Sequence, residues 1–166
     1  MRTAVRILGL DPGLRVTGWG IIDVLGTHIR HIAHGVICPK VEQDLSFRLK
    51  QLFEGLRGII ELYEPDEACV EETFVNKNPA STLKLGMARG VVLMVPSLFD
   101  IRVSEYSANK VKKSVVGVGH ADKHQISTMV QFLLPGAKGV TADAADALAI
   151  ALCHTSHRTF LKSAVA

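Results

Sequence analysis

Residues 5–36 read VRILGLDPGLRVTGWGIIDVLGTHIRHIAHGV, and this stretch decides the fold. It begins with an apolar, β-branched run that stops at an Asp-Pro-Gly turn at residues 11–13, a pattern typical of a buried strand. Two further strand-like runs, residues 17–24 and 28–36, are separated only by the sequence Leu-Gly-Thr at 25–27. We therefore predict an antiparallel meander of three strands at the beginning of the chain.

Helical and strand patterns alternate along the rest of the chain. Apolar residues recur at helical spacing over 45–63, and a short strand is predicted at 67–71. Asn78, Ser107 and Asp122 are typical N-cap residues, each at the start of a helical pattern. The remaining predicted elements are a helix at 79–94, a strand at 99–106, and helices at 108–115, 123–134 and 142–154. This order predicts an α/β fold with a mixed five-stranded sheet and helices on both faces.

Length and composition indicate one ordinary folded domain. The chain has 166 residues, of which 48% are hydrophobic and 21% are charged, enough to bury a core and too apolar for a disordered protein. We expect residues 1–166 to form a single domain, with about the last ten residues as a frayed tail. Three cysteines without a CxxC pair favour the reducing cytoplasm, and no apolar stretch is long enough to predict a membrane span.

Basic residues are concentrated in one part of the chain. The net charge is only +3, yet residues 74–123 carry eight basic and three acidic side chains. Such a segment is typical of a surface that contacts nucleic acid. A solvated lysine-rich face explains the same charge pattern equally well.

Four acidic residues stand where predicted strands end or where a helix begins. Asp11 follows the first strand, and alternation along the strand at 67–71 turns Glu71, rather than Glu72, toward the face of Asp11. Asp143 and Asp146 are three residues apart on an alanine-rich helix, so they share one face, and small side chains let that helix approach the sheet. The four carboxylates are therefore candidates for one site, although each alone could cap a turn or interact with a helix dipole.

A cluster of four carboxylates requires cations, because like charges a few ångströms apart raise one another's pKa. Two divalent ions would balance four negative charges, and oxygen ligands suit Mg²⁺, with Mn²⁺ as a substitute. Such a pair of ions activates water and stabilises the leaving oxygen in phosphodiester hydrolysis. The acidic residues therefore predict a two-metal nuclease.

Four blocks of sequence, in order over nearly the whole chain, resemble the RuvC family of bacterial Holliday-junction resolvases. They are LGLDPGLRVTGWG at 8–20, VEETFVNKNPASTLKLGMARG at 70–90, KKSVVGVGHADKHQ at 112–125 and ADAADALAIAL at 142–152. The resemblance implies a ribonuclease H-like fold, a homodimer and Mg²⁺-dependent paired nicks in a four-way DNA junction during recombination and repair. It also implies cooperation with the RuvAB branch-migration complex.

The resemblance extends to individual residues. The family's metal ligands correspond to Asp11, Glu71, Asp143 and Asp146. Its two important basic positions fall on Lys112, expected at the DNA backbone, and on Lys123, expected near the reacting phosphate and counted with the catalytic residues. Phe74 is expected to stack on bases near the crossover. The other expected DNA contacts are Lys77, Lys84, Arg89 and Lys113.

Three other functions fit part of the pattern. A related nuclease that processes ribosomal RNA precursors shares the fold but is typically shorter. An actin- or sugar-kinase-like ATPase shares the Asp-Pro-Gly loop at 11–13 but needs a second domain and a second phosphate loop. A junction-binding protein with an inactive site is disfavoured because all four carboxylates are present.

Several conspicuous side chains are expected to be structural. His28, His31 and His34 recur every third residue, a spacing that alternates between the two faces of a strand and therefore does not predict a metal site. Trp19 and Met87 are expected in the core.

Overall fold

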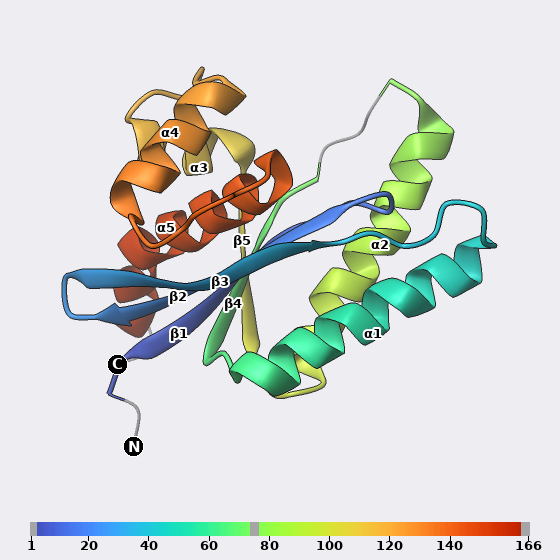
Figure 1. Ribbon diagram of the computed structural model, residues 1–166, viewed down its shortest axis with the longest axis horizontal. Helices are drawn as coiled ribbons and strands as arrows, with labels where there is room; N and C mark the ends of the chain where they lie inside the picture. Colours follow the sequence, from blue (N-terminus) through green and yellow to red (C-terminus); the bar gives the residue numbers. More distant parts are fainter. Residues whose placement is uncertain (1–2, 74–76, 164–166) are drawn as a thin grey trace.

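The computed structural model describes residues 3–73 and 77–163 (Figure 1). Its strands are β1 (Val5–Asp11), β2 (Thr17–Leu25), β3 (His28–Ile37), β4 (Glu67–Glu71) and β5 (Arg102–Tyr106). They form one sheet in the order β3-β2-β1-β4-β5, antiparallel among the first three strands and parallel from β1 through β4 to β5. The predicted mixed five-stranded sheet and its N-terminal meander are confirmed.

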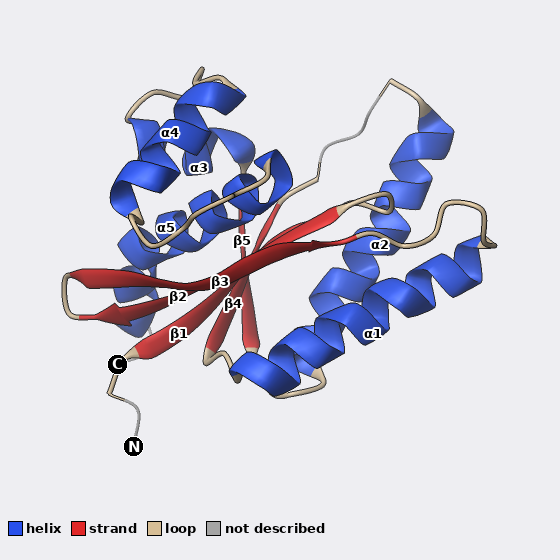
Figure 2. Ribbon diagram, viewed as in Figure 1, coloured by secondary structure: helices blue, strands red, loops and turns tan. Residues whose placement is uncertain are grey.

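Helices cover both faces of the sheet, as Figure 2 shows. The helices are α1 (Leu45–Tyr63), α2 (Pro79–Ser97), α3 (Ala108–Val116), α4 (Lys123–Leu133) and α5 (Ala142–Ser163). The first two lie on one face and the last three on the other. The side chains of Asn78, Ser107 and Asp122 accept backbone N–H groups at the starts of α2, α3 and α4, so the three predicted N-caps are confirmed.

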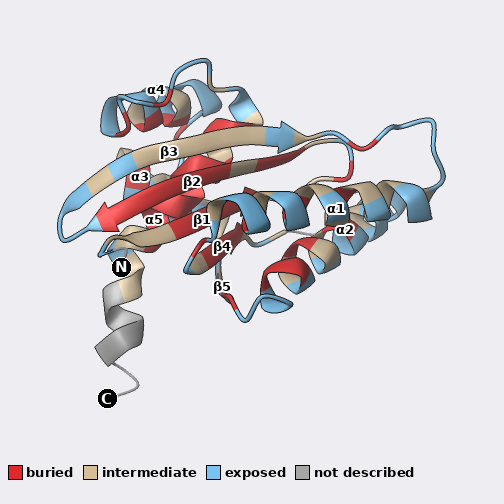
Figure 3. Cartoon of the chain, turned by 60° about the horizontal axis from the view of Figure 1, so that its bottom comes forward, coloured by how far each residue is buried: buried red, intermediate tan, exposed pale blue. Residues whose placement is uncertain are grey.

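Alternation along the central strands divides the core into two layers. Ile7 of β1 packs toward α3, α4 and α5, whereas its neighbour Leu8 packs toward α1 and α2. Both side chains are fully buried. Burial is greatest along β1 and β2 in the middle of the sheet, while the edge strand β3 is only half-buried (Figure 3).

Glycines in β1 and β2 bring α5 unusually close to the sheet. A Cβ atom added to Gly9 would lie 2.1 Å from the carbonyl oxygen of Ala147, and one added to Gly18 would lie 2.0 Å from that of Asp143. Only residues without a side chain fit at these two strand positions. The close approach expected from the alanine-rich helix is therefore present, and it fixes where the first turn of α5 lies.

The C-terminal helix is longer than predicted. We expected it to end near His154 and to be followed by a frayed tail, but α5 continues to Ser163. His154 and Arg158 both bind Glu67 of β4, with nitrogen–oxygen distances of 2.8 Å, and these contacts stabilise the extra turns. The predicted end of this helix near His154 is therefore wrong, and the frayed tail stays a prediction.

Two other boundaries also differ from the prediction. Helix α2 continues to Ser97 with Pro96 inside its last turn, and β5 begins at Arg102 instead of residue 99. The connecting residues form a turn in which Asp100 has a positive φ of 56°, which is incompatible with a strand. Strand propensity alone did not reveal this turn.

The histidines of β3 do not alternate as expected. The pairing of β2 with β3 shifts between Ile21 and Ile22, which is typical of a β-bulge. His31 and His34 consequently meet, with Nε2 of the first 2.8 Å from Nδ1 of the second.

Met87, expected in the core, is 38% exposed on α2. No helix in the described ranges combines the length and apolar character that crossing a membrane requires.

Candidate active site

Four carboxylates meet at one end of the sheet, and we call Asp11, Glu71, Asp143 and Asp146 the carboxylate cluster. Asp11 and Glu71 are the last residues of β1 and β4, which pair directly as parallel strands. Asp143 and Asp146 lie at the start of α5, where the backbone of Asp143 contacts Gly18, the residue of β2 that pairs with Asp11. Segments far apart in the sequence thus supply one cluster.

Burial and mutual repulsion raise the pKa of three members of the cluster. Burial, followed by the charges of Glu71, Asp146 and Asp143, raises the pKa of Asp11 to about 8. Burial also raises the pKa of Glu71, with Asp146 as the next cause, and it raises the pKa of Asp146, to which the charge of Asp143 adds. These interactions place all four charges in one small region.

Two lysines from neighbouring helices oppose this negative charge. Nζ of Lys123, the first residue of α4, lies 3.9 Å from Oδ2 of Asp146, and the lysine side chain is 80% exposed. Its positive charge lowers the pKa of Asp11, Glu71 and Asp146 and so partly offsets the effect of burial. Lys112 of α3 has the same effect on Glu71 and Asp146. Both predicted basic positions therefore border the carboxylate cluster.

The cluster suits Mg²⁺ in donor chemistry and in charge. Carboxylate oxygens are the ligands that Mg²⁺ prefers, and a divalent cation would offset the repulsion that raises the pKa of Asp11 to about 8. Within the described part of the chain, however, no three His, Cys, Asp or Glu side chains are arranged closely enough to hold one ion. The residues fit the metal, but their side chains must turn toward one another to bind it.

The other predicted DNA contacts are spread over α2 and α3. Lys84 and Lys113 are exposed on these two helices, and Lys77 is exposed just before α2. Arg89 forms an ion pair with an acidic residue of β5, so its charge is balanced within the fold. Phe74 lies outside the described residues. The DNA-binding roles of these five residues stay predictions.

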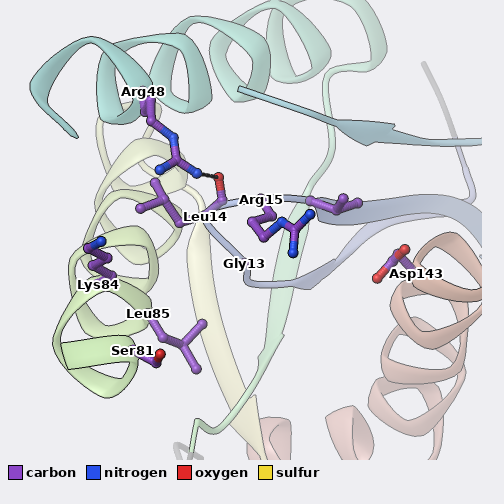
Figure 4. A pocket seen from close by; sticks show the side chains of 9 residues that line it. Gly13, Leu14, Arg15, Arg48, Ser81, Lys84, Leu85 and Asp143 are labelled. Carbon is purple, nitrogen blue, oxygen red and sulfur yellow. Dashed lines mark hydrogen bonds between the residues drawn. The ribbon is translucent and has the colours of Figure 1, made fainter. Parts of the chain in front are cut away.

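Sequence reasoning missed a cleft beside the cluster, shown in Figure 4. The cleft has a volume of about 600 Å³ and is lined by the loop after β1 and by residues of α1, α2 and α5. Arg15 and Arg48 line it together with Lys84 and Asp143. Arg15 lies two residues after the Asp-Pro-Gly turn and could have been noticed in the sequence. Nothing in the sequence pattern distinguished Arg48 from other residues of an amphipathic helix.

The strand order and the connections of this sheet define the ribonuclease H-like class of fold. The sequence model of the family described as crossover junction endodeoxyribonuclease RuvC matches residues 7–154. The chain therefore belongs to the RuvC family, as its sequence motifs predicted.

Individual relatives agree with this assignment. The chain is 60% identical to crossover junction endodeoxyribonuclease RuvC of Paramagnetospirillum magneticum over 154 residues, which cover 93% of each chain. It is 53% identical to the protein of the same description from Rhizobium leguminosarum bv. trifolii, over 95% of this chain and 94% of that one. The solved structure of T. thermophilus RuvC in complex with Holliday junction substrate matches with a TM-score of 0.86 and 28% identity, over 94% of this chain and 96% of that one. These similarities favour a junction resolvase over the ribosomal RNA nuclease.

Proposed function

We propose that this chain resolves four-way DNA junctions by hydrolysing phosphodiester bonds at the carboxylate cluster with two Mg²⁺ ions. The observation that carries this proposal is that β1, β4 and the first turn of α5 bring four carboxylates to one end of the sheet, where burial and three neighbouring carboxylates raise the pKa of Asp11. So much negative charge would repel a DNA phosphate unless cations offset it. The description shared by the family, crossover junction endodeoxyribonuclease, supports the substrate class.

Each residue of the site has a distinct role in this proposal. Asp11, Glu71, Asp143 and Asp146 hold the ions. When bound, two Mg²⁺ ions supply an activated water and stabilise the leaving oxygen. The exposed ammonium of Lys123, next to Asp146, is positioned to contact the phosphate that is cleaved. Lys112, on the neighbouring helix α3, is positioned to bind the DNA backbone nearby.

A homodimer that pairs through α2 is part of the proposal, because two opposed nicks require two sites. Leu83, Met87 and Met94 lie at helical spacing on α2 and are 63%, 38% and 47% exposed. A Cβ atom added to Gly86 or Gly90 would meet nothing within 4 Å, so a second helix has room to approach closely. We call Leu83, Met87 and Met94 the α2 stripe. Pairing of the α2 stripe with the same stripe of a second copy, about a two-fold axis, would present two equivalent sites to the junction.

Two further expectations from the sequence are part of the proposal, one from the family resemblance and one from the cysteine pattern. Cooperation with the RuvAB branch-migration complex and action in the cytoplasm stay predictions. A pull-down of purified RuvA and RuvB with the junction-bound protein would test the first.

The function is tested by cleavage of three substrates under identical conditions. The purified chain is incubated with a synthetic four-way junction, a linear duplex of the same arm sequence and a ribosomal RNA precursor fragment, with Mg²⁺ or with EDTA. We expect symmetric nicks in opposed strands of the junction alone, only with Mg²⁺, and none from Asp11→Asn. Preferential cleavage of the RNA would support the alternative nuclease, and equal cleavage of the linear duplex would overturn structure selectivity.

A further inference from the structure

The cleft beside the carboxylate cluster has an excess of positive charge. Arg15, Arg48 and Lys84 contribute three cations to its lining, and Asp143 contributes one anion at the border with the cluster. Among the described residues, neither Arg15 nor Lys84 forms an ion pair, and both are exposed. The cleft therefore presents two uncompensated cations directly beside the expected site of cleavage.

The loop that carries Arg15 is held from two sides. On the inner side, the fully buried Thr17 donates its hydroxyl hydrogen to the carbonyl of Gly13 at 2.6 Å and accepts the Gly13 N–H at 3.2 Å. On the outer side, Nη2 of Arg48 donates to the carbonyl of Leu14 at 3.1 Å, as the dashed line in Figure 4 shows. Arg15 follows Leu14, so its backbone position is fixed before any ligand binds.

Arg48 has hydrogen-bonding capacity to spare. Its Nε is buried and has no hydrogen-bond partner among the residues that the structure describes. A buried N–H group without a partner is costly, so such a group is normally satisfied by a ligand or by water. The contribution of Arg48 to the cleft is its Nη2 bond to the carbonyl of Leu14, which holds the loop that carries Arg15.

We propose that this cleft binds a second phosphodiester of the cleaved DNA strand, next to the phosphodiester that is hydrolysed. Arg15 and Lys84 contact its nonbridging oxygens. Arg48 acts as a positioning residue through the loop. The apolar side chains of Leu14 and Leu85 also line the cleft and suit the carbon atoms of the deoxyribose. This inference rests on the proposed function and adds a second point at which the strand is held, so that the scissile phosphate is aligned by the cleft as well as by the metal site.

The position of Asp143 decides which part of the cleft the phosphate occupies. Its carboxylate lines the cleft and also raises the pKa of Asp11, so it belongs to both sites. A phosphate would be repelled at that end and attracted at the end formed by Arg15 and Lys84. The bound strand therefore runs from the carboxylate cluster, past Asp143, toward α2.

Removal of one charge on the DNA tests the proposal directly. Four-way junctions are prepared with a single neutral methylphosphonate at each of three positions on either side of the cleavage site. Binding is measured by fluorescence anisotropy in Ca²⁺ or EDTA, without cleavage. For the unsubstituted protein, we expect one neutral position to weaken binding on the order of five- to tenfold, the scale of a charge-assisted contact.

Variants then connect that position to the cleft. Arg15→Gln and Lys84→Gln should each weaken binding of the normal junction, reduce the salt slope by about one and remove the penalty of the neutral phosphate at that position. Arg57→Gln is the matched control, because this arginine is exposed on α1 and pairs with Glu61 outside the cleft. Arg48→Lys keeps the positive charge but removes the planar guanidinium that donates to the carbonyl of Leu14. It should lower the rate of single-turnover cleavage, while the salt dependence of junction binding stays unchanged.

The outcomes separate this inference from the proposed function. Failure to bind or cleave any junction would overturn the proposed function itself. Normal junction cleavage, with Arg15→Gln and Lys84→Gln indistinguishable from Arg57→Gln, would overturn the cleft alone. If the neutral phosphate weakens binding equally in both cleft variants, that phosphate is bound by another part of the protein, and the inference is likewise overturned.

Discussion

The backbone of Gly18 in β2 touches the carbonyl oxygen of Asp143 in α5, where an added Cβ atom would lie only 2.0 Å away. Gly18 pairs with Asp11 across the sheet, so this contact sets the distance between the strand and helix that carry the cluster. The alignment of the carboxylate cluster therefore depends on a residue that has no side chain.

Substitution of Gly18 should harm catalysis more than stability. Gly18→Ala must push the first turn of α5 away from the sheet, which costs about 1–3 kcal/mol of unfolding free energy. A displacement of ligands by about 1 Å is expected to lower cleavage on the order of 10²-fold. Denaturant unfolding and junction cleavage with Mg²⁺ measure the two effects.

Gly58→Ala is the matched control, because a Cβ atom there meets nothing within 4 Å and the residue lies within α1. It should preserve activity and stabilise the protein by about 0.4–1 kcal/mol. Wild-type cleavage by Gly18→Ala would show that the helix position does not govern the site.

The carboxylates should separate cleavage from binding. Asp11→Asn, Glu71→Gln and Asp146→Asn each remove the charge of a metal ligand, so each should abolish cleavage while the affinity for a junction stays largely intact. Asp143→His should be the mildest change, because imidazole can still bind Mn²⁺. Gel shifts and cleavage on the same preparations decide this, and near-normal cleavage by two of the first three variants would refute the two-metal assignment.

Removal of the Asp11 charge should stabilise the metal-free protein at alkaline pH. The pKa of Asp11 in the folded protein is about 8, above the ordinary value of 3.8 expected after unfolding. Between these values the folded state binds more protons, so the free energy of unfolding falls as pH rises from about 4 to 8. Asp11→Asn removes this loss and should raise Tm in EDTA at pH 8.5 by about 3–6 °C, with a smaller gain at pH 5.

The exposed neighbour Glu72 provides a comparison for that measurement. Glu72→Gln changes the net charge equally but lies outside the cluster, and it should leave the pH dependence of Tm unchanged. Saturating Mg²⁺ should reverse the ranking, with the unsubstituted protein gaining more stability than Asp11→Asn. Equal pH profiles for Asp11→Asn and the unsubstituted protein would contradict a raised pKa at Asp11.

The two lysines should affect different steps. Lys112→Ala should weaken junction binding and make the salt dependence shallower by about one counterion, as expected for a backbone contact. Lys123→Ala should lower the rate at which bound junction is cleaved on the order of 10²-fold, because one contact to the charge of the transition state is lost. Single-turnover rates at saturating enzyme remove the affinity effect, and an unchanged rate for Lys123→Ala would assign that residue to the solvated surface.

The stripe on α2 should control assembly. Met87→Glu places charges against one another across the proposed two-fold axis, so sedimentation should change from a dimer to a monomer of 18.0 kDa at micromolar concentration. Paired nicking should then be lost, while the Tm of the monomer stays within a few degrees. Phe132→Glu replaces an apolar side chain that is 75% exposed on α4, outside the proposed interface, and it should leave the dimer intact. A dimer that survives Met87→Glu would place the interface elsewhere.

Local patterns predicted most of this fold, because hydrophobic periodicity and N-cap residues are properties of short segments. The choice of Glu71 over Glu72 followed from alternation along a strand, and the coupling of Glu71 to the cluster agrees with it. The length of α5 was missed because it depends on Glu67, far away in sequence. The contact between His31 and His34 was missed because it depends on a bulge in the pairing of two strands.

The order of the cluster along the chain has a consequence for synthesis in the cell. Asp11 is made first and Glu71 much later, and Asp143 and Asp146 follow another 72 and 75 residues after Glu71. No product of translation that stops before Asp146, and no fragment cut before α5, carries all four acidic residues. The carboxylate cluster can therefore assemble only after the first turn of α5 has been synthesised, so an early-terminated chain or an N-terminal fragment lacks part of it.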